Sequence, residues 1–347
     1  MASSIALIGS GIFAKEEHLP AIRATPLLEL KAIYSRSRKS AEALASGLEN
    51  VELYSEDSEG RTYDELLKRE DITGVIIALP IAVQPSYIKK AILAGKHVLA
   101  EKPIAKDVAT ATELLQWYKS HIASSGPQSS TKAPIFAIAE NFRFFESFTY
   151  AAEKIASFGR VLQFRTRVSN LVQPGGKYYE TAWRKTPEYQ GGFLLDGGVH
   201  FIAATRLMLG EKAAPVKTSA FTAQLQEHLP PLDTLNATVQ LRNGASGTLA
   251  ISFGTTFTGS EYAVAAEKGS VWVSRGKVIV TQNGEEEVKE FPDEGNGVKQ
   301  EVRAWAESLL KGEPNLLQSP EEALRDLALL EACLVSGKQG GAPVEIQ

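Results

Sequence analysis

The sequence predicts an α/β protein in which a parallel sheet is followed by an α+β domain with a large, mainly antiparallel open sheet. Short apolar runs alternate with helical stretches over residues 1–140, the pattern of a parallel sheet with helices on both faces. Beyond residue 141, β-rich runs are joined by turn pairs such as Asn-Gly, which are typical of antiparallel hairpins. We therefore expect one domain over 1–140 and a second over 141–347, whose closing helices can pack back on the first.

The first domain is expected to have five short buried strands with helices between them. The strands are 5–8, 28–34, 74–79, 97–100 and 135–139. The helices are 19–24, 40–47, 63–69, 86–94 and 108–121. Segment 124–134 is rich in Ser, Gly, Pro and Thr, which predicts a flexible surface loop between a helix and the next strand.

The second domain is expected to be mainly β-structure, closed by two helices. Its predicted strands are 161–168, 235–241, 247–253, 262–266, 270–274 and 277–281. The acidic run 285–287 is interpreted as a solvated hairpin. The last helix has a strong start signal, with Ser319 as N-cap, Pro320 at the first helical position and Glu322 as the capping-box partner.

Composition excludes several classes of protein. The 347 residues are 44% hydrophobic and 22% charged with a net charge of −4, which argues against a disordered chain and a nucleic-acid binder. Cys333 is the only cysteine, so no intramolecular disulfide forms, and we expect it in the core. No apolar run approaches the roughly 20 residues of a membrane helix, and the N-terminus does not resemble a signal peptide. The expected location is cytoplasmic.

A glycine turn after the first strand predicts a dinucleotide site. Residues 9–14 spell Gly-Ser-Gly-Ile-Phe-Ala, a G-x-G-x-x-A pattern between a strand and a helix. Gly9 permits the tight turn, Gly11 lets the backbone approach a pyrophosphate, and Ala14 lets the helix pack closely. The alternative is a tight turn without a ligand.

The end of the second strand predicts the cofactor. An NAD-binding protein usually has an Asp or Glu there for the ribose hydroxyls, but residues 34–38 read Tyr-Ser-Arg-Ser-Arg. Hydroxyls and guanidinium groups favour a 2′-phosphate, so we expect NADP(H), with Ser35, Arg36 and Arg38 around the phosphate. The alternative is that these residues are solvated and that Ser37 or Ser40 caps the next helix.

Two separate segments carry candidate acid–base groups. Lys102 follows the strand 97–100, and ligands of open α/β sheets bind beyond the carboxyl ends of strands. Pro103 fixes the turn after Lys102, and a cis bond there is possible. Asp196 and His200 are four apart at the start of an apolar helix, where the carboxylate can orient the imidazole. The alternative makes Asp196 an N-cap and His200 structural.

Taken together, the motifs resemble the glucose-fructose oxidoreductase/inositol dehydrogenase (Gfo/Idh/MocA) family, most closely its fungal NADPH-dependent members. They are Gly9-x-Gly11-x-x-Ala14, the segment 94–103 ending in Glu-Lys-Pro, Trp183-Arg184, Asp196-Gly-Gly-Val-His200 and the closing 319–323 helix start. The resemblance covers nearly the whole chain. It implies a Rossmann domain followed by a domain whose open sheet builds a homodimer or homotetramer.

The resemblance also implies the roles of particular residues. Lys102, Asp196 and His200 would be the catalytic set, with Lys102 and His200 contacting the reacting oxygen. Cofactor contacts would come from Gly9, Gly11, Ile12, Phe13, Ala14, Ser35, Arg36, Ser37, Arg38, Leu79, Pro80, Glu101 and Lys102. Substrate contacts would come from Asn141, Arg143, Lys177, Tyr179, Trp183 and Arg184, although Tyr179 and Trp183 are equally interpreted as packing residues.

Two departures from the family pattern weaken the transfer of substrate identity. Ala203 stands where the family often has a second Asp, and the turn 80–84 lacks a frequent His. The remaining histidines show no ligand spacing with one another or with Cys333, so no metal site is expected. We expect an NADP(H)-dependent oxidoreductase acting on a carbonyl or alcohol carbon of a small polar molecule such as a sugar or polyol. The alternative is a non-catalytic NADP sensor or scaffold.

Overall fold

The computed structural model describes residues 2–124 and 133–346, which form two compact units. The first unit contains residues 1–140 and 298–324, and the second contains 141–297 and 325–347. The first break falls between residues 140 and 141. Segment 298–324 belongs to the first unit although it follows most of the second in the chain.

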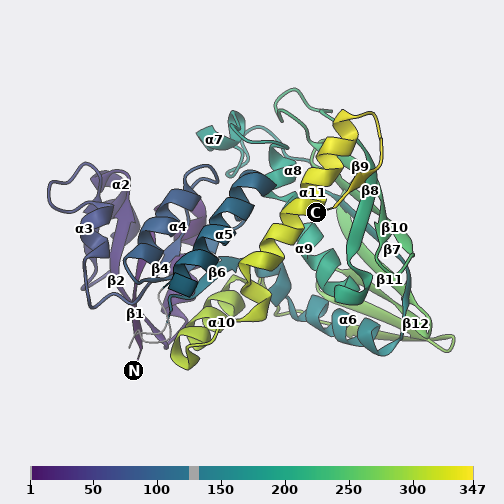
Figure 1. The fold of residues 1–347 in the computed structure, drawn as a ribbon, viewed down its shortest axis with the longest axis horizontal. Coiled ribbons are helices and arrows are strands. Elements are labelled where there is room, and N and C mark those ends of the chain that lie inside the picture. The colour runs from purple at the N-terminus through teal and green to yellow at the C-terminus, as the bar shows by residue number, and fades with distance from the viewer. Residues whose placement is uncertain (1, 125–132, 347) are drawn as a thin grey trace. The chain divides into compact units, whose positions relative to one another are not determined.

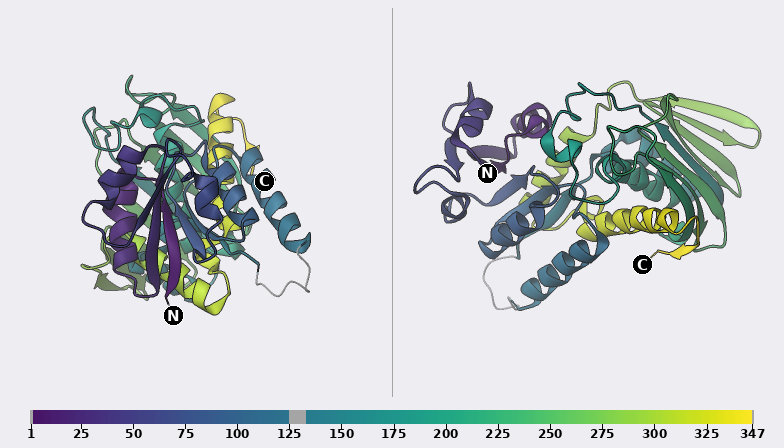
Figure 2. Two further views of the ribbon diagram at one scale, coloured as in Figure 1. Left: turned by 90° about the vertical axis from the view of Figure 1, so that its left-hand side faces the viewer. Right: turned by 90° about the horizontal axis from the view of Figure 1, so that it is seen from above.

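A six-stranded parallel sheet forms the centre of the first unit, in the order β3-β2-β1-β4-β5-β6. Helices cover both of its faces (Figure 2). The strands are β1 (Ser3–Ile8), β2 (Leu28–Ser35), β3 (Glu52–Ser55), β4 (Gly74–Ile77), β5 (His97–Glu101) and β6 (Phe136–Ala139). The helices are the π-helical η1 (Ala14–His18), α1 (Leu19–Arg23), α2 (Arg38–Ala45), α3 (Tyr63–Leu67), α4 (Gln84–Leu93), α5 (Val108–Ser124), α10 (Val298–Lys311) and the 3₁₀ turn η4 (Leu316–Gln318).

Helix α10 completes one face of this sheet. Trp305 is fully buried, in one cluster with Ile5 and Leu99 of the strands. Its ring lies so close to Gly74 that a Cβ there would come within 3.0 Å of it. The apolar face of the first sheet is therefore covered in part by residues from the far end of the sequence.

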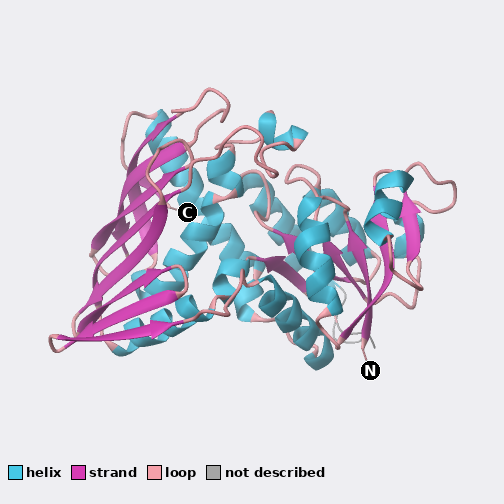
Figure 3. Cartoon of the chain, turned by 180° about the vertical axis from the view of Figure 1, so that it is seen from behind, coloured by secondary structure: helices cyan, strands magenta, loops and turns pink. Residues whose placement is uncertain are grey.

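The second unit is built around a nine-stranded mixed sheet in the order β14-β13-β12-β11-β7-β10-β9-β8-β15. Only the pair β7 and β10 is parallel. The strands are β7 (Val161–Ser169), β8 (Pro215–Ala223), β9 (Thr234–Leu241), β10 (Ser246–Ser252), β11 (Gly259–Ala266), β12 (Gly269–Ser274), β13 (Lys277–Gln282), β14 (Glu285–Glu290) and β15 (Val344–Glu345). Helices line one side of this layer, as Figures 1 and 3 show. They are η2 (Asn141–Phe144), α6 (Glu146–Ser157), α7 (Ala182–Lys185), α8 (Phe193–Asp196), α9 (Gly198–Leu209), η3 (Glu211–Ala213) and α11 (Pro320–Lys338), which begins in the first unit.

The sheet face opposite the helices carries exposed apolar side chains. Trp272 and Phe221 are 40% and 68% exposed, and Arg165 lies over the Trp272 ring at 4.5 Å. Assembly into a dimer or tetramer through this sheet stays a prediction.

The predicted fold class is confirmed, and the differences concern individual strands. The expected list omits β3, β8, β14 and β15, and most of the predicted loop 124–134 lies outside the described residues. The acidic run 285–287 is a hairpin strand with exposed side chains, as expected. Ser319 caps α11 by accepting from the Glu322 N–H at 3.2 Å, and Cys333 is fully buried. Among the described residues, no helix has both the length and the apolar character to cross a bilayer.

Candidate active site

The carboxyl ends of four neighbouring strands bring the predicted cofactor residues to one edge of the first sheet. Ile8 of β1 lies opposite Tyr34 of β2 and Ile77 of β4, and Ile77 lies opposite Ala100 of β5. The segments that follow these strands therefore start at the same level. This edge is where ligands of doubly wound sheets bind.

The glycine turn after β1 has the shape that a pyrophosphate site needs. Gly9 has φ = +114°, and a Cβ there would lie 2.2 Å from the Ala78 carbonyl oxygen, so only glycine fits. A Cβ on Gly11 would meet nothing within 4 Å, so one side of this turn is backbone that a ligand can approach. The chain enters helical geometry at once, with the Lys15 N–H donating to the Gly11 carbonyl at 3.1 Å. These residues fit a dinucleotide phosphate.

The residues after β2 have different environments. The Ser35 hydroxyl is buried and lies 2.6 Å from that of Ser10, which connects the two turns. Ser37 caps α2, as the alternative interpretation held. Arg38 pairs with Glu42 at 2.9 Å, whereas Arg36 is exposed and has no ion pair among the described residues. Arg36 is therefore the better candidate for a 2′-phosphate contact.

Asp57 is a nearby carboxylate that the sequence analysis missed. Its Oδ1 accepts from the Arg38 backbone N–H at 2.8 Å. Hydrogen bonds from Ser55 and from that N–H lower the pKa of Asp57 below its usual value. β3 pairs in parallel with β2, so residues after Ser55 reach the same edge. Recognising residues 52–55 as a strand would have placed Asp57 here.

Lys102 follows a residue that is held on two sides. The buried Gln84 side-chain amide donates to the Glu101 carbonyl at 3.1 Å, and His18 Nε2 lies 2.7 Å from Glu101 Oε1. The Lys102–Pro103 bond is cis. The other predicted cofactor residues near this edge are half-buried: Ile12, Phe13, Leu79 and Pro80.

In the second unit, Asp196 ends α8 and His200 lies in the first turn of α9. Gly197 separates the helices and provides no side-chain cap, so Asp196 is not the N-cap of α9. Asp196 Oδ2 accepts from Arg184 Nε at 2.6 Å. The His200 ring stacks on Phe142, with centroids 4.8 Å apart and an interplanar angle of 20°. Arg184 therefore balances the carboxylate charge, and Phe142 orients the imidazole plane.

The loop before α8 contains most of the predicted substrate residues. The Arg184 guanidinium lies 4.0 Å from the Trp183 ring centroid, and Tyr179 packs between Phe193 and His228. Burial and the negative charge of Asp196 raise the pKa of Tyr189 in the same neighbourhood, and Lys177 lies over Tyr178. Tyr179 and Trp183 are half-buried and contact neighbouring aromatic rings, and their contact with a substrate stays a prediction.

Asn141 and Arg143 lie inside the second unit. The Asn141 amide donates to the Asn296 carbonyl at 2.6 Å. Arg143 is 3% exposed and pairs with Asp326 of α11. Both side chains are therefore held in internal contacts, and the structure does not group them with Lys177, Trp183 and Arg184.

Comparison with known proteins covers both units. A family model for the "oxidoreductase family, NAD-binding Rossmann fold" matches residues 3–124. A second model, for the "C-terminal alpha/beta domain" of the same Gfo/Idh/MocA family, matches residues 152–346.

Individual relatives match along most of their length. Dehydrogenase FPY6 of Fusarium mangiferae is 46% identical over 97% of each chain. An Actinomadura kijaniata protein named dTDP-3,4-didehydro-2,6-dideoxy-α-D-glucose 3-reductase is 26% identical over 94% of this chain and 93% of its own. The crystal structure of an oxidoreductase from Thermotoga maritima superposes with a TM-score of 0.86 at 32% identity, covering 100% of this chain and 99% of that one.

Proposed function

Because the chain belongs to the Gfo/Idh/MocA oxidoreductase family and has its nucleotide-binding Rossmann fold, we propose that it is an NADP(H)-dependent enzyme acting on a small polar carbonyl or alcohol, such as a sugar or polyol. The observation that carries the NADP(H) proposal is the end of β2. There a buried Ser35 and an exposed Arg36, which has no ion pair in the described part of the chain, stand where an NAD-binding protein usually has a carboxylate. Asp57 acts against this preference, and the pairing of its Oδ1 with the Arg38 N–H moderates that effect.

Hydride transfer is the chemistry that the nicotinamide supplies when bound, and the chain's own residues handle the substrate oxygen and its proton. Lys102 would polarise and position that oxygen. His200 would accept the hydroxyl proton during oxidation and return it during reduction, with its plane set by Phe142. Asp196 would orient the His200 imidazole in this proposal, and its carboxylate is paired with Arg184.

A sugar or polyol substrate is supported by the name of one relative and by the side chains of the loop before α8. The Actinomadura relative's name specifies a keto-sugar nucleotide as its substrate. Arg184, Lys177 and Tyr178 give the loop of the second unit both cationic and aromatic surface, which suits a polar ring with hydroxyl groups. Sugars and polyols are therefore the first compounds to test.

Cofactor choice is tested by Arg36→Ala. A charge-assisted phosphate contact contributes about 1.5–3 kcal/mol, so NADPH should bind at least about tenfold more tightly than NADH. Arg36→Ala should remove most of that preference and leave NADH affinity unchanged, as measured by calorimetric titration. Arg61→Ala, an exposed arginine paired with Glu52, serves as the control. Equal dissociation constants for the two cofactors in the unaltered protein would refute the assignment.

Chemistry is tested by Lys102→Ala and His200→Ala. A positioned acid–base group contributes about 10²–10⁴-fold in rate, so each variant should lose kcat/KM in that range while NADPH binding hardly changes. If both serve one oxygen, the double variant should be far less than multiplicatively worse. Lys68→Ala, an exposed lysine of the same unit, is the control. A His200→Ala protein that turns over normally but melts early would mean that His200 is structural.

A further inference from the structure

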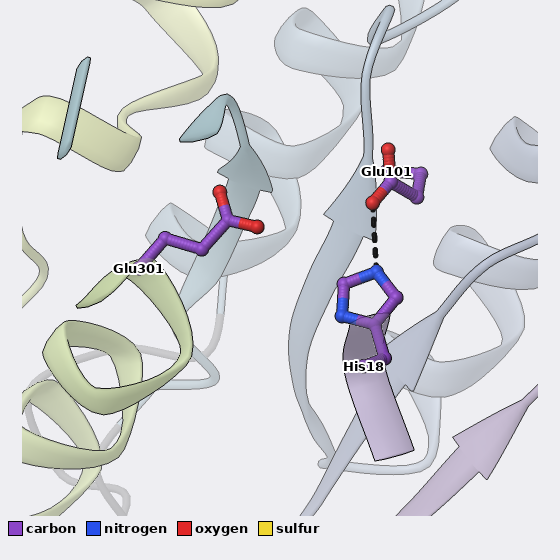
Figure 4. A group of neighbouring side chains, drawn as sticks. All are labelled: His18, Glu101 and Glu301. Atoms are coloured by element: carbon purple, nitrogen blue, oxygen red, sulfur yellow. Dashed lines mark hydrogen bonds and ion pairs between the residues drawn. The ribbon is translucent and has the colours of Figure 1, made fainter. Parts of the chain in front are cut away.

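A cluster of three ionisable side chains, two of them buried, lies beside the segment that carries Lys102. His18 comes from η1, Glu101 from the end of β5 and Glu301 from α10 (Figure 4). One nitrogen or oxygen atom from each lies within 4.8 Å of the others. All three belong to the first unit, and they are separated by 83 and 200 residues along the chain.

Several polar atoms of this cluster have no hydrogen-bond partner among the described residues. His18 Nε2 lies 2.7 Å from Glu101 Oε1, and His18 and Glu301 are both fully buried. His18 Nδ1 and both carboxyl oxygens of Glu301 have no hydrogen-bond partner among the described residues. A buried polar group without a partner is costly, and a buried lone carboxylate is more so. A proton shared between Glu301 and His18 would satisfy these unpartnered atoms.

Proton positions follow from what each group can donate. The Glu101 carboxylate only accepts, so Nε2 carries the proton of that hydrogen bond, and in a neutral imidazole Nδ1 is then an acceptor. Burial, with the negative charges of Glu101 and Glu140, raises the pKa of Glu301 well above its usual value, and Lys102 acts in the opposite direction. A protonated Glu301 is a donor, and one of its oxygens lies within 4.8 Å of a His18 ring nitrogen.

Glu101 links the cluster to Lys102. His18 holds the Glu101 side chain, and Gln84 holds its backbone carbonyl, so the backbone that leads into Lys102 is fixed at two points. The next residue is Lys102 itself. With Glu301 protonated, the cluster carries a single negative charge, which matches the one positive charge of Lys102.

We propose that Glu301 and His18 are positioning residues for Lys102, acting as a hydrogen-bonded chain from the Glu301 carboxylic acid through the His18 imidazole to the Glu101 carboxylate. The chain fixes the Glu101 side chain and thereby the orientation and charge of its neighbour. This inference rests on the proposed role of Lys102 in turnover.

Two substitutions of Glu301 separate this role from a purely structural one. Glu301→Gln keeps a donor for Nδ1 and should retain most of the turnover. Glu301→Leu removes the donor and leaves His18 Nδ1 without a partner, but it also removes a buried carboxyl group, so its two effects on the unfolding free energy oppose each other, and urea unfolding is measured alongside. Glu301→Leu should lower kcat by about tenfold or more and change the pH profile of kcat, while NADPH affinity stays the same. Glu307, which is partly exposed on the same helix and pairs with Arg303, provides the control. Glu307→Gln and Glu307→Leu should leave kcat and its pH profile unchanged.

A readout without substrate keeps this test separate from that of the proposed function. Nitrogen-15 NMR of the imidazole rings, with His18 assigned through His18→Gln, reports which ring nitrogen carries the proton. Unaltered protein and Glu301→Gln should show Nε2 protonated and Nδ1 accepting a hydrogen bond, and Glu301→Leu should lose the second feature. The inference is overturned by unchanged His18 nitrogen shifts in Glu301→Leu, by normal kcat in an active Glu301→Leu protein, or by a stoichiometric divalent metal in the purified protein. If no substrate is turned over but the NMR pattern holds, the proposed function has failed, whereas the hydrogen bonds from Glu301 through His18 to Glu101 are supported.

Discussion

Each unit buries a cluster of charged groups, and the two clusters are satisfied to different degrees. In the second unit, Asp326 of α11 lies between two arginines, with Oδ2 accepting from Arg143 and Oδ1 from Arg206 at 2.6 Å. In the first unit, Glu301 lies beside Glu101 and His18, and its carboxyl oxygens have no hydrogen-bond partner within residues 2–124 and 133–346.

The difference lies in the balance of donors and acceptors. Two guanidinium groups supply more N–H donors than Asp326 can use, so the second cluster connects η2, α9 and α11 as a structural joint. The first cluster has an excess of acceptors and depends on a proton for its stability. Buried charge alone is therefore weak evidence of function, whereas a buried group left with unused capacity next to a candidate catalytic lysine is stronger evidence.

The largest effect is expected when the balanced cluster is broken. Asp326→Ala leaves two buried arginines without their carboxylate, and loss of one partner of a buried ion pair costs about 3–5 kcal/mol of unfolding free energy. Urea unfolding measures this cost, with the exposed Asp293→Ala as the control. A loss below about 1 kcal/mol would mean that the two arginines find other partners and that the joint is not structural.

A smaller, pH-dependent effect is expected at the other cluster. The pKa of Glu301 is raised in the folded state, so the unfolded chain releases that proton first and stability falls as pH rises above the ordinary value of 4.5. The unfolding free energy of the unaltered protein should therefore fall relative to that of Glu301→Gln, by at most about 1.4 kcal/mol per pH unit. Urea titrations at about pH 5 and about pH 7 measure the slope. Parallel curves for the two proteins would show that Glu301 is ionised in the folded state, and Glu307→Gln gives the baseline.

The sequence predicted best what depends on neighbouring residues. Gly9 and Ala14 could be assigned because a strand, a turn and a helix follow one another within a few positions. β3 was missed because its four residues include only two apolar side chains, and β14 because its six residues are mostly acidic. Asp57 was missed together with β3.

Contacts between distant segments could not be predicted. Arg143 was assigned to the substrate, but its partner Asp326 lies 183 residues away, and no local pattern indicates that pairing. Ligand spacing among the histidines and Cys333 does not reveal contacts with carboxylates, and no local pattern indicates that His18 pairs with Glu101, 83 residues away. Local patterns specify turns and caps, whereas the topology of the chain decides which charges meet in the interior.

The position of Trp305 has a consequence for how the protein is made. The N-terminus emerges from the ribosome first, so all six strands of the first sheet emerge long before α10 does. Until then, the apolar face around Ile5 and Leu99 lacks the helix that covers it. The nascent first unit therefore exposes an apolar surface while the whole of the second sheet apart from β15 is synthesised, and such surfaces are the ones that chaperones bind. Folding of the first unit is completed only after translation has passed residue 311.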